Sequence, residues 1–445
     1  DAPRGLVFPG DPGVAKGIAH GAHAYMPRAG FAWDPTGVGT WSVRASYGLF
    51  YDQFQNGAGT ASQIAISAIP WAQFNQFSGV GLNFQNPYSG RAFPAPESFV
   101  RPSTVFGLDV DAKPPYTQNW NVSIQRSLWG THLLELRYVG AAGSRLPRNV
   151  EANPAVYGPG ATAQNADRRR IYANCPPDGG ACDFSTIAML KNITRSSFNS
   201  GQVSLSRRYA SGFGFNVSYW LSKSLDHLSA MNLSGSAAKP LAGENDLAQN
   251  PFDLEAEWGP SLFDARHRFV ASASWEPHVP RATPAVVRAI ADGWQINVIG
   301  AYNSGTPFTV SDSANVSLQA NSPPISGFAA SRPNVVGDPN AGPHRVDEWI
   351  SRSAFQRLDP LTQAGQFGNA GRNIARGPSY TNVDLSLVRT VPISGVRLQL
   401  RAEAFNVLNH ANFGLPVGDL NSPNFGRILS AGPPRLMQFA AKVMF

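Results

Sequence analysis

Apolar and polar residues alternate with a period of two along much of the chain, which is the pattern of β-strands with one apolar face. Between positions 41 and 51, Trp41, Val43 and Tyr47 fall on one face, while Arg44 and Ser46 fall on the other. Almost no segment shows the period of about 3.6 residues that marks an amphipathic helix. We therefore expect an all-β protein. Eleven strands are predicted, at about residues 25–33, 41–51, 118–127, 132–140, 200–209, 213–222, 267–275, 294–303, 382–390, 396–407 and 436–445.

The connections between these strands alternate between short and long. Short links are expected at about 34–40, 128–131, 210–212 and 391–395, with a somewhat longer one at 276–293. The long connections are polar, rich in Gly and Pro and predicted to be irregular, and they cover 52–117, 141–199, 223–266, 304–381 and 408–435. Outer-membrane barrels have tight periplasmic turns at one rim and extended extracellular loops at the other. The sequence therefore predicts an antiparallel transmembrane β-barrel with long extracellular loops, and it lacks the regular blade repeat of a soluble propeller.

Aromatic residues lie near both ends of several predicted strands on the apolar face, as in Trp41 with Tyr51 and Trp294 with Tyr302. The steps from Trp41 to Tyr51 span ~33 Å along a strand, or ~24 Å along the membrane normal at a tilt near ~45°, which matches the apolar band of a barrel. These aromatics are interpreted as two interfacial girdles. The alternative is one face of a soluble β-sandwich core.

Composition narrows the class further. Only 15% of the 445 residues are charged, and 43 Gly and 36 Pro indicate many turns. Soluble domains average about 25% charged residues, so much of this surface is not expected to face bulk water. No run approaches the roughly 18 apolar residues of a membrane-spanning helix. The net charge of +7 is scattered rather than clustered, which argues against nucleic-acid binding.

The only two cysteines, Cys175 and Cys182, lie in the turn-forming segment NCPPDGGAC. A disulfide that closes a surface loop is expected, which implies an oxidising compartment. A metal site is the weaker interpretation because zinc requires about four ligands and no CxxC or HxxxH motif lies nearby. His20 and His23 lack a carboxylate partner, and the acidic stretch 243–257 lacks the spacing of a calcium loop. We expect no metal and no cofactor.

No catalytic motif is present. Ser261, Asp264 and His267 include the residue types of a triad, but there is no nucleophile elbow, GxSxG or HExxH. The protein is therefore not expected to be an enzyme. Aromatic residues in the long connections either contact a ligand or anchor the loops to one another, and they are Trp71, Phe74, Phe77, Phe84, Tyr88, Trp258 and Trp349.

The last ten residues, LMQFAAKVMF, place apolar residues on one face up to the final position. This segment resembles the C-terminal signal that the barrel-assembly machinery reads in bacterial outer-membrane barrels. The resemblance assigns that role to Phe439, Ala441, Val443 and Phe445.

Further segments resemble, in order and over essentially the whole chain, the β-barrel of Oar-like TonB-dependent receptors. They are RAGFAWDP (28–35), SVRASYGLFYD (42–52), VSLSRRY (203–209), SYWLSKSLD (218–226), FDARHRFV (263–270), RGPSYTNVDLSLV (376–388), RAEAFNVLNHANFG (401–414) and SPNFGRILSAGPPRLMQFA (422–440). The resemblance implies a 22-stranded barrel with an upstream plug, a regulatory-like domain and a TonB box. Residues 1–445 would then be its C-terminal half, about eleven strands, which need a partner sheet because open edges are costly in hydrocarbon.

The polar residues that alternate with apolar ones along the strands are predicted to form a wall that faces the lumen. The residues assigned to it are Arg44, Asn121, Gln125, Glu135, Arg137, Arg208, Asn297, Asp384, Arg397, Arg401 and Glu403. A turn near 393–394 would place Asp384 opposite or diagonal to Arg401 and Glu403, which predicts a structural charge pair rather than a proton-transfer site.

Three functions fit these features. The first is active uptake of a large, unidentified solute across the outer membrane, with lipid, the TonB complex and the assembly machinery as partners. The second is a passive outer-membrane pore or an adhesin without energy coupling. The third is a secreted soluble β-protein that binds carbohydrate.

Overall fold

The computed structural model describes most of the chain. The described residues are 5, 10–14, 24–52, 101–109, 111–229, 247–280, 282–312, 314, 316–319, 331–393 and 395–444. His20, His23, Phe445 and the predicted loop aromatics between 71 and 88 lie outside them.

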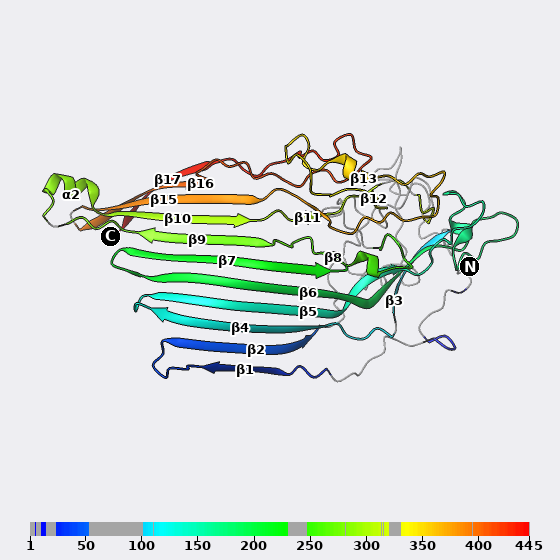
Figure 1. The fold of residues 1–445 in the computed structure, drawn as a ribbon, viewed down its shortest axis with the longest axis horizontal. Helices are drawn as coiled ribbons and strands as arrows, with labels where there is room; N and C mark the ends of the chain where they lie inside the picture. Colours follow the sequence, from blue (N-terminus) through cyan, green and yellow to red (C-terminus); the bar gives the residue numbers. More distant parts are fainter. Residues whose placement is uncertain are drawn as a thin grey trace, which may run out of the picture.

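One large sheet dominates the structure, and its main path follows chain order (Figure 1). Neighbours along this path are antiparallel, as predicted, and each of the eleven predicted segments overlaps one strand of the path. The strands are β1 (Arg28–Trp33), β2 (Trp41–Tyr51), β4 (Tyr116–Leu128), β5 (His132–Glu151), β6 (Phe184–Ala210), β7 (Phe213–Asp226), β9 (His267–Trp275), β10 (Trp294–Asn303), β15 (Tyr380–Ile393), β16 (Val396–Phe405) and β17 (Leu436–Met444). Within the described residues β1 and β17 do not pair, so the sheet is open.

The β5–β6 hairpin is longer than predicted. Residues 141–151 continue β5, and residues 184–199 belong to β6, although the whole of 141–199 was expected to be an irregular loop. The alternation is weak here because 140–144 are small residues and 195–200 are polar except for Phe198, while backbone hydrogen bonds sustain the pairing. Strand β3 (Ser103–Leu108) pairs in parallel with the first residues of β6, and β8 (Gly259–Pro260) pairs antiparallel with the last two residues of β7.

The short links gather at one end of the sheet and the long connections at the other (Figure 1). The longest of the short links carries helix α2 (Ala285–Ala291), which the sequence pattern did not predict. Among the described residues no helix has the length and apolarity needed to cross a membrane.

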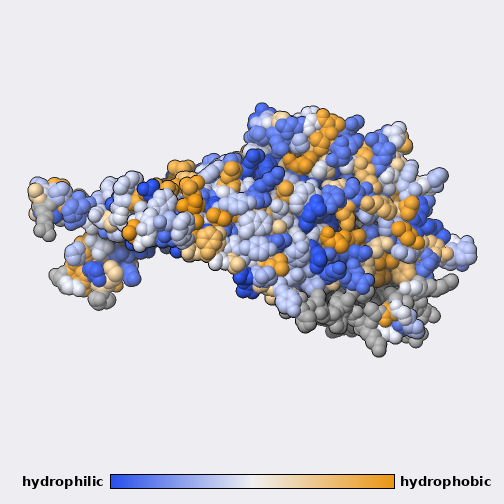
Figure 2. Space-filling model, turned by 60° about the horizontal axis from the view of Figure 1, so that its bottom comes forward, coloured by the Kyte–Doolittle hydropathy of each residue, from blue (hydrophilic) through white to orange (hydrophobic). Residues whose placement is uncertain are grey.

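The described parts of the connections 304–381 and 408–435 pack into an ordered layer, here called the loop assembly, which corrects the expectation that these two connections are irregular. It is the bulky end of the molecule in Figure 2, and the sheet extends away from it. Short strand pairs build it, β11 (Pro307–Phe308) with β14 (Ala375–Arg376) and β12 (Asn334–Val335) with β13 (Phe355–Gln356). Its apolar core consists of Phe308, Val310, Ile350, Ala354, Phe355, Ala375, Leu420 and Phe425. Burial of these side chains from two connections, 304–381 and 408–435, holds the layer together.

Candidate functional site

The pairing register divides the sheet into two chemically distinct faces. Residues directly opposite one another share a face, so Val122 pairs with Tyr138, and Ser123 pairs with Arg137 on the other side. Val122 and Tyr138 are exposed large apolar side chains, whereas Ser123 is buried. We call the first the apolar face and the second the polar face.

Hydrogen bonds link neighbouring strands across the polar face. Asn121 Nδ2 donates to Ser46 Oγ at 2.5 Å between β4 and β2. Ser274 Oγ donates to Asn297 Oδ1 at 2.7 Å between β9 and β10. On β16, Arg401 Nε donates to Gln399 Oε1 at 3.1 Å. The first two bonds join neighbouring strands, and the third lies within β16.

Glu135 binds two neighbouring side chains on this face. It accepts a hydrogen bond from Gln125 Nε2 at 3.2 Å and pairs with Arg137, whose Nη2 lies 2.5 Å from Oε1. Arg137 keeps 40% of its side chain exposed. Arg44, on the same face of β2, donates from Nε to Ser42 Oγ at 3.0 Å.

The predicted charge pair of Asp384 with Arg401 is not formed. The turn lies one residue later than expected, so Ile393 pairs with Val396 and Arg401 lies opposite Val388. Asp384 instead accepts hydrogen bonds from Asn382 Nδ2 and from the backbone amide of Asn406, both at 2.9 Å. It therefore fixes the end of β16 rather than neutralising an arginine.

Three further predicted positions lie on β16 and near the end of β6. Glu403 accepts from Ser386 Oγ at 3.3 Å, and Arg397 lies opposite both Pro392 and Met444. Arg208 lies next to the 211–212 turn, where its amide donates to the Thr131 carbonyl.

On the last strand, Phe439, Ala441 and Val443 lie opposite Ala402, Leu400 and Leu398, all of them on the apolar face. The pairing register thus gives β17 the same two-faced pattern as the strands before it.

Three tyrosines of the apolar face make one repeated contact. The hydroxyls of Tyr47 and Tyr138 donate to Gln118 Oε1 at 2.9 Å and to Asn199 Oδ1 at 2.6 Å, each on the next strand and nearer the loops. The hydroxyl of Tyr219 lies 2.7 Å from His267 Nδ1 in the same arrangement. Their positions shift by about one residue for each strand crossed, as the tilt of a barrel's strands requires.

A buried charge cluster lies where the sheet meets the loop assembly. Glu257 accepts from Arg332 Nη1 at 3.0 Å and from Nη2 at 2.9 Å, and both side chains are nearly fully buried. Arg148 Nη2 lies 3.7 Å from the same carboxylate. Burial opposes ionisation of Glu257, but the two guanidinium groups outweigh it and keep the pKa of this carboxyl below its usual value.

Arg372 and Arg376 tie the loop assembly to β7 and to the start of β9. Arg372 pairs with Asp226, the last residue of β7, and both are buried. Arg376 Nη2 lies 2.5 Å from Asp264 Oδ2. Next to Asp226 lies buried His227, whose carbonyl accepts from Arg148 Nη1 at 2.6 Å. Burial lowers the pKa of the His227 imidazole, against the opposing effect of the nearby Glu255.

These loop arginines were not singled out from the sequence. Arg332 lies 75 positions from Glu257, and Arg372 lies 146 positions from Asp226. No periodic pattern links residues at such separations. The one signal available was the acidic stretch 243–257, in which Glu257 pairs with Arg332 and Arg148. Among the described residues there is no group of three metal-ligating side chains.

The other candidate residues have structural partners. Cys175 and Cys182 form a disulfide. Ser261 Oγ lies 2.8 Å from Ser224 Oγ and His267 contacts Tyr219, so no Ser–His–Asp relay is assembled.

Two loop aromatics anchor the loops to one another. Trp258 lies 5.0 Å from the ring of His227 and under Arg195, while Trp349 donates from Nε1 to the Arg376 carbonyl at 2.8 Å. The described members of the aromatic set thus serve contacts within the protein.

Comparison with solved structures returns outer-membrane proteins at low identity. The chain is similar to the outer membrane transporter YddB from Escherichia coli, with 12% identity and a TM-score of 0.45 over 93% of this chain and 39% of that one. It is similar to the ferripyoverdine receptor of Pseudomonas aeruginosa, with 11% identity and a TM-score of 0.41 over 94% and 32%. It is also similar to the siderophore receptor PiuA from Acinetobacter baumannii, with 9% identity and a TM-score of 0.40 over 93% of this chain and 35% of that one. The chain thus spans about a third to two fifths of these proteins, and likeness at this level carries no function across.

No curated protein matches the sequence. A family profile described as an outer membrane beta barrel domain matches residues 1–438, nearly the whole chain. Together with the antiparallel, two-faced sheet, this match places the protein in the outer membrane, in a family of barrels rather than of enzymes. The chain belongs to the outer membrane beta barrel domain family.

Proposed function

We propose that this chain is part of a TonB-dependent receptor that actively takes up a large solute across the outer membrane. The observation that supports this best is the polar face, which lies opposite an apolar face and whose side-chain hydrogen bonds join β2 to β4, β4 to β5 and β9 to β10. In a barrel the apolar face meets lipid, so the polar face lines the lumen. The ordered segments that resemble Oar-like receptors agree with this role.

The loop assembly supports capture at the extracellular rim. A packed core and a buried charge cluster hold these connections in one arrangement, and a pre-arranged surface binds a ligand at lower entropic cost than mobile loops. Energy coupling would come from a plug and the TonB complex, and barrel assembly from recognition of Phe439, Ala441 and Val443 with Phe445.

The test uses the full-length protein in a Gram-negative host with and without TonB. Cells receive labelled probes of three classes, a ferric chelate, an oligosaccharide and a peptide, and accumulation is measured with and without a protonophore. We expect at least one probe to accumulate only when TonB and the proton gradient are both present. Energy-independent passage of the probes through protein-containing liposomes would instead show a passive pore, and cell binding without accumulation would show an adhesin.

A further inference from the structure

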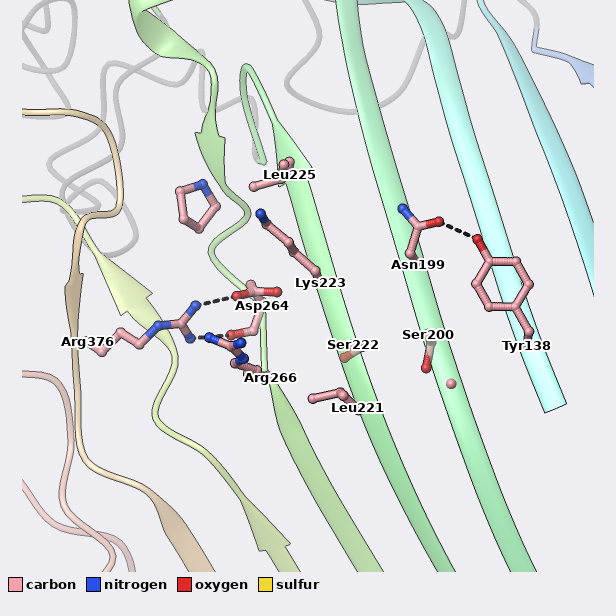
Figure 3. Close-up of a pocket in the computed structure, with 12 residues that line it drawn as sticks. Tyr138, Asn199, Ser200, Leu221, Ser222, Lys223, Leu225, Asp264, Arg266 and Arg376 are labelled. Carbon is pink, nitrogen blue, oxygen red and sulfur yellow. Dashed lines mark hydrogen bonds and ion pairs between the residues drawn. The ribbon is translucent and has the colours of Figure 1, made fainter. Parts of the chain in front are cut away.

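A pocket of about 370 Å³ opens on the apolar face, where β5, β6 and β7 approach the loop assembly (Figure 3). Tyr138, Gly201 and Leu221 lie side by side in register and form its lower part. A methyl group built on Gly201 would have no heavy atom within 4 Å, so this glycine leaves a notch between the exposed Tyr138 and Leu221. The notch has an apolar side chain on each side and opens on the apolar face, which meets lipid in a barrel.

The pocket lies just above the row of tyrosines. Tyr219 is on β7, two residues farther from the loop assembly than Leu221 and four residues farther than Lys223. Four residues at ~3.3 Å each and a tilt near ~45° raise Lys223 by ~9 Å along the membrane normal. Tyr219 has the place in this row that Tyr47 has on β2, so Lys223 lies level with Tyr51, at the interfacial girdle where hydrocarbon gives way to headgroups.

The upper rim of the pocket is cationic. Lys223 and Arg266 are exposed, and among the described residues neither side chain has an ion-pair partner. Arg376, beside Arg266 in Figure 3, contributes a third cation, and Asp264, which it binds, is the one acid of the lining. The rim therefore carries a formal excess of two positive charges directly above an apolar notch.

We propose that this pocket binds a phosphorylated amphiphile of the outer leaflet, with its phosphate between Lys223 and Arg266 and an acyl chain in the notch over Gly201. Two cations that have no ion-pair partner within the described part of the chain match a phosphate, and the apolar notch over Gly201 matches the attached chain. A soluble anion would make no apolar contact in the notch, and a neutral lipid would form no ion pair with Lys223 or Arg266. The site depends on the outer-membrane location and not on uptake.

The test is native mass spectrometry of the detergent-purified full-length protein, with diphosphoryl lipid A as the probe and phosphatidylcholine as the neutral comparison. Wild type is expected to retain lipid A and not phosphatidylcholine. The double variant Lys223→Gln/Arg266→Gln removes two surface cations and is expected to weaken lipid A binding by about thirtyfold. Gly201→Leu fills the notch without changing charge and is expected to weaken binding as well.

The matched control is Arg345→Gln/Arg427→Gln, which removes two exposed cations of the loop assembly and is expected to leave lipid binding unchanged. Gel heat-modifiability verifies folding, and Gly201→Leu tests the site independently if the charge variant does not fold. Equal retention of both lipids, or no retention of lipid A, would overturn the proposal. So would displacement of lipid A by millimolar inorganic phosphate together with an unaffected Gly201→Leu variant, which would mean an anion site only.

Discussion

Arg332 and Glu257 form a two-pronged ion pair, with 3.0 Å between Nη1 and Oε2 and 2.9 Å between Nη2 and Oε1. The pair joins the 304–381 connection to the residues just before β8, and it is nearly fully buried. The guanidinium of Arg332 also donates from Nε to the Ala370 carbonyl at 2.8 Å. This one contact therefore couples the packing of the loop assembly to the rim of the sheet.

Replacing Glu257 with Gln is expected to destabilise the loop assembly by about 3–5 kcal/mol, because it leaves Arg332 and Arg148 as buried cations without their carboxylate. The measurement is limited proteolysis of the detergent-solubilised protein, in which cleavage within 304–381 should accelerate. The matched control is Glu255→Gln. Glu255 pairs with Arg195 at 2.8 Å, but both side chains are more than half exposed, so the expected cost is below about 1 kcal/mol. Equal proteolysis of the two variants would contradict this account.

His227 is expected to make the loop assembly sensitive to mild acid. Its pKa is lowered by burial, so the folded state binds the proton less well than the unfolded state does. The stability that neutral His227 contributes is complete above its unfolded pKa, and it falls as pH drops below about 6.5 towards the lowered folded value. Proteolysis rates measured between about pH 7 and 5 should rise in wild type and rise less in His227→Gln.

Glu257 contributes in a lower pH range. Its folded pKa lies below its usual value, so its stabilisation is intact above that usual value and is lost only as pH falls further. A wild-type profile that stayed flat down to about pH 4.5, near the ordinary carboxyl range, would show that His227 does not act in this way.

The orientation of β17 can be tested with neighbouring substitutions. Phe439 lies on the apolar face opposite Ala402, and Gln438 lies on the polar face opposite Glu403. Phe439→Lys is expected to lower the stability of the inserted barrel by about 2–4 kcal/mol if the position is near the bilayer midplane, whereas Gln438→Lys should be tolerated beside Glu403. The measurement is the fraction of heat-modifiable protein in outer-membrane preparations. A larger loss from Gln438→Lys would mean that the two faces are assigned the wrong way round.

The extent of sequence-based prediction differs between the sheet and the loops for a physical reason. Strands such as β9 and β10 were predicted to the residue because each alternates between a lipid-compatible face and a polar face. No periodic pattern in the sequence predicts contacts such as that of Arg332 with Glu257, since they depend on how distant loops fold against one another. The missing Asp384–Arg401 pair lies between these cases: the strands were correct, but a turn displaced by one residue shifts the register by two.

The Trp120 indole packs closely on Gly140. The two residues are paired on the apolar face of β4 and β5, and a methyl group on Gly140 would overlap the Trp120 indole. Gly140→Ala is therefore expected to push the indole aside, at a cost of about 1–3 kcal/mol. Gly300→Ala, on the same face of β10 with no heavy atom within 4 Å of the added methyl, is the matched control and should cost little. Thermal unfolding in detergent measures both, and equal stability of the two variants would show that Trp120 does not depend on the space above Gly140.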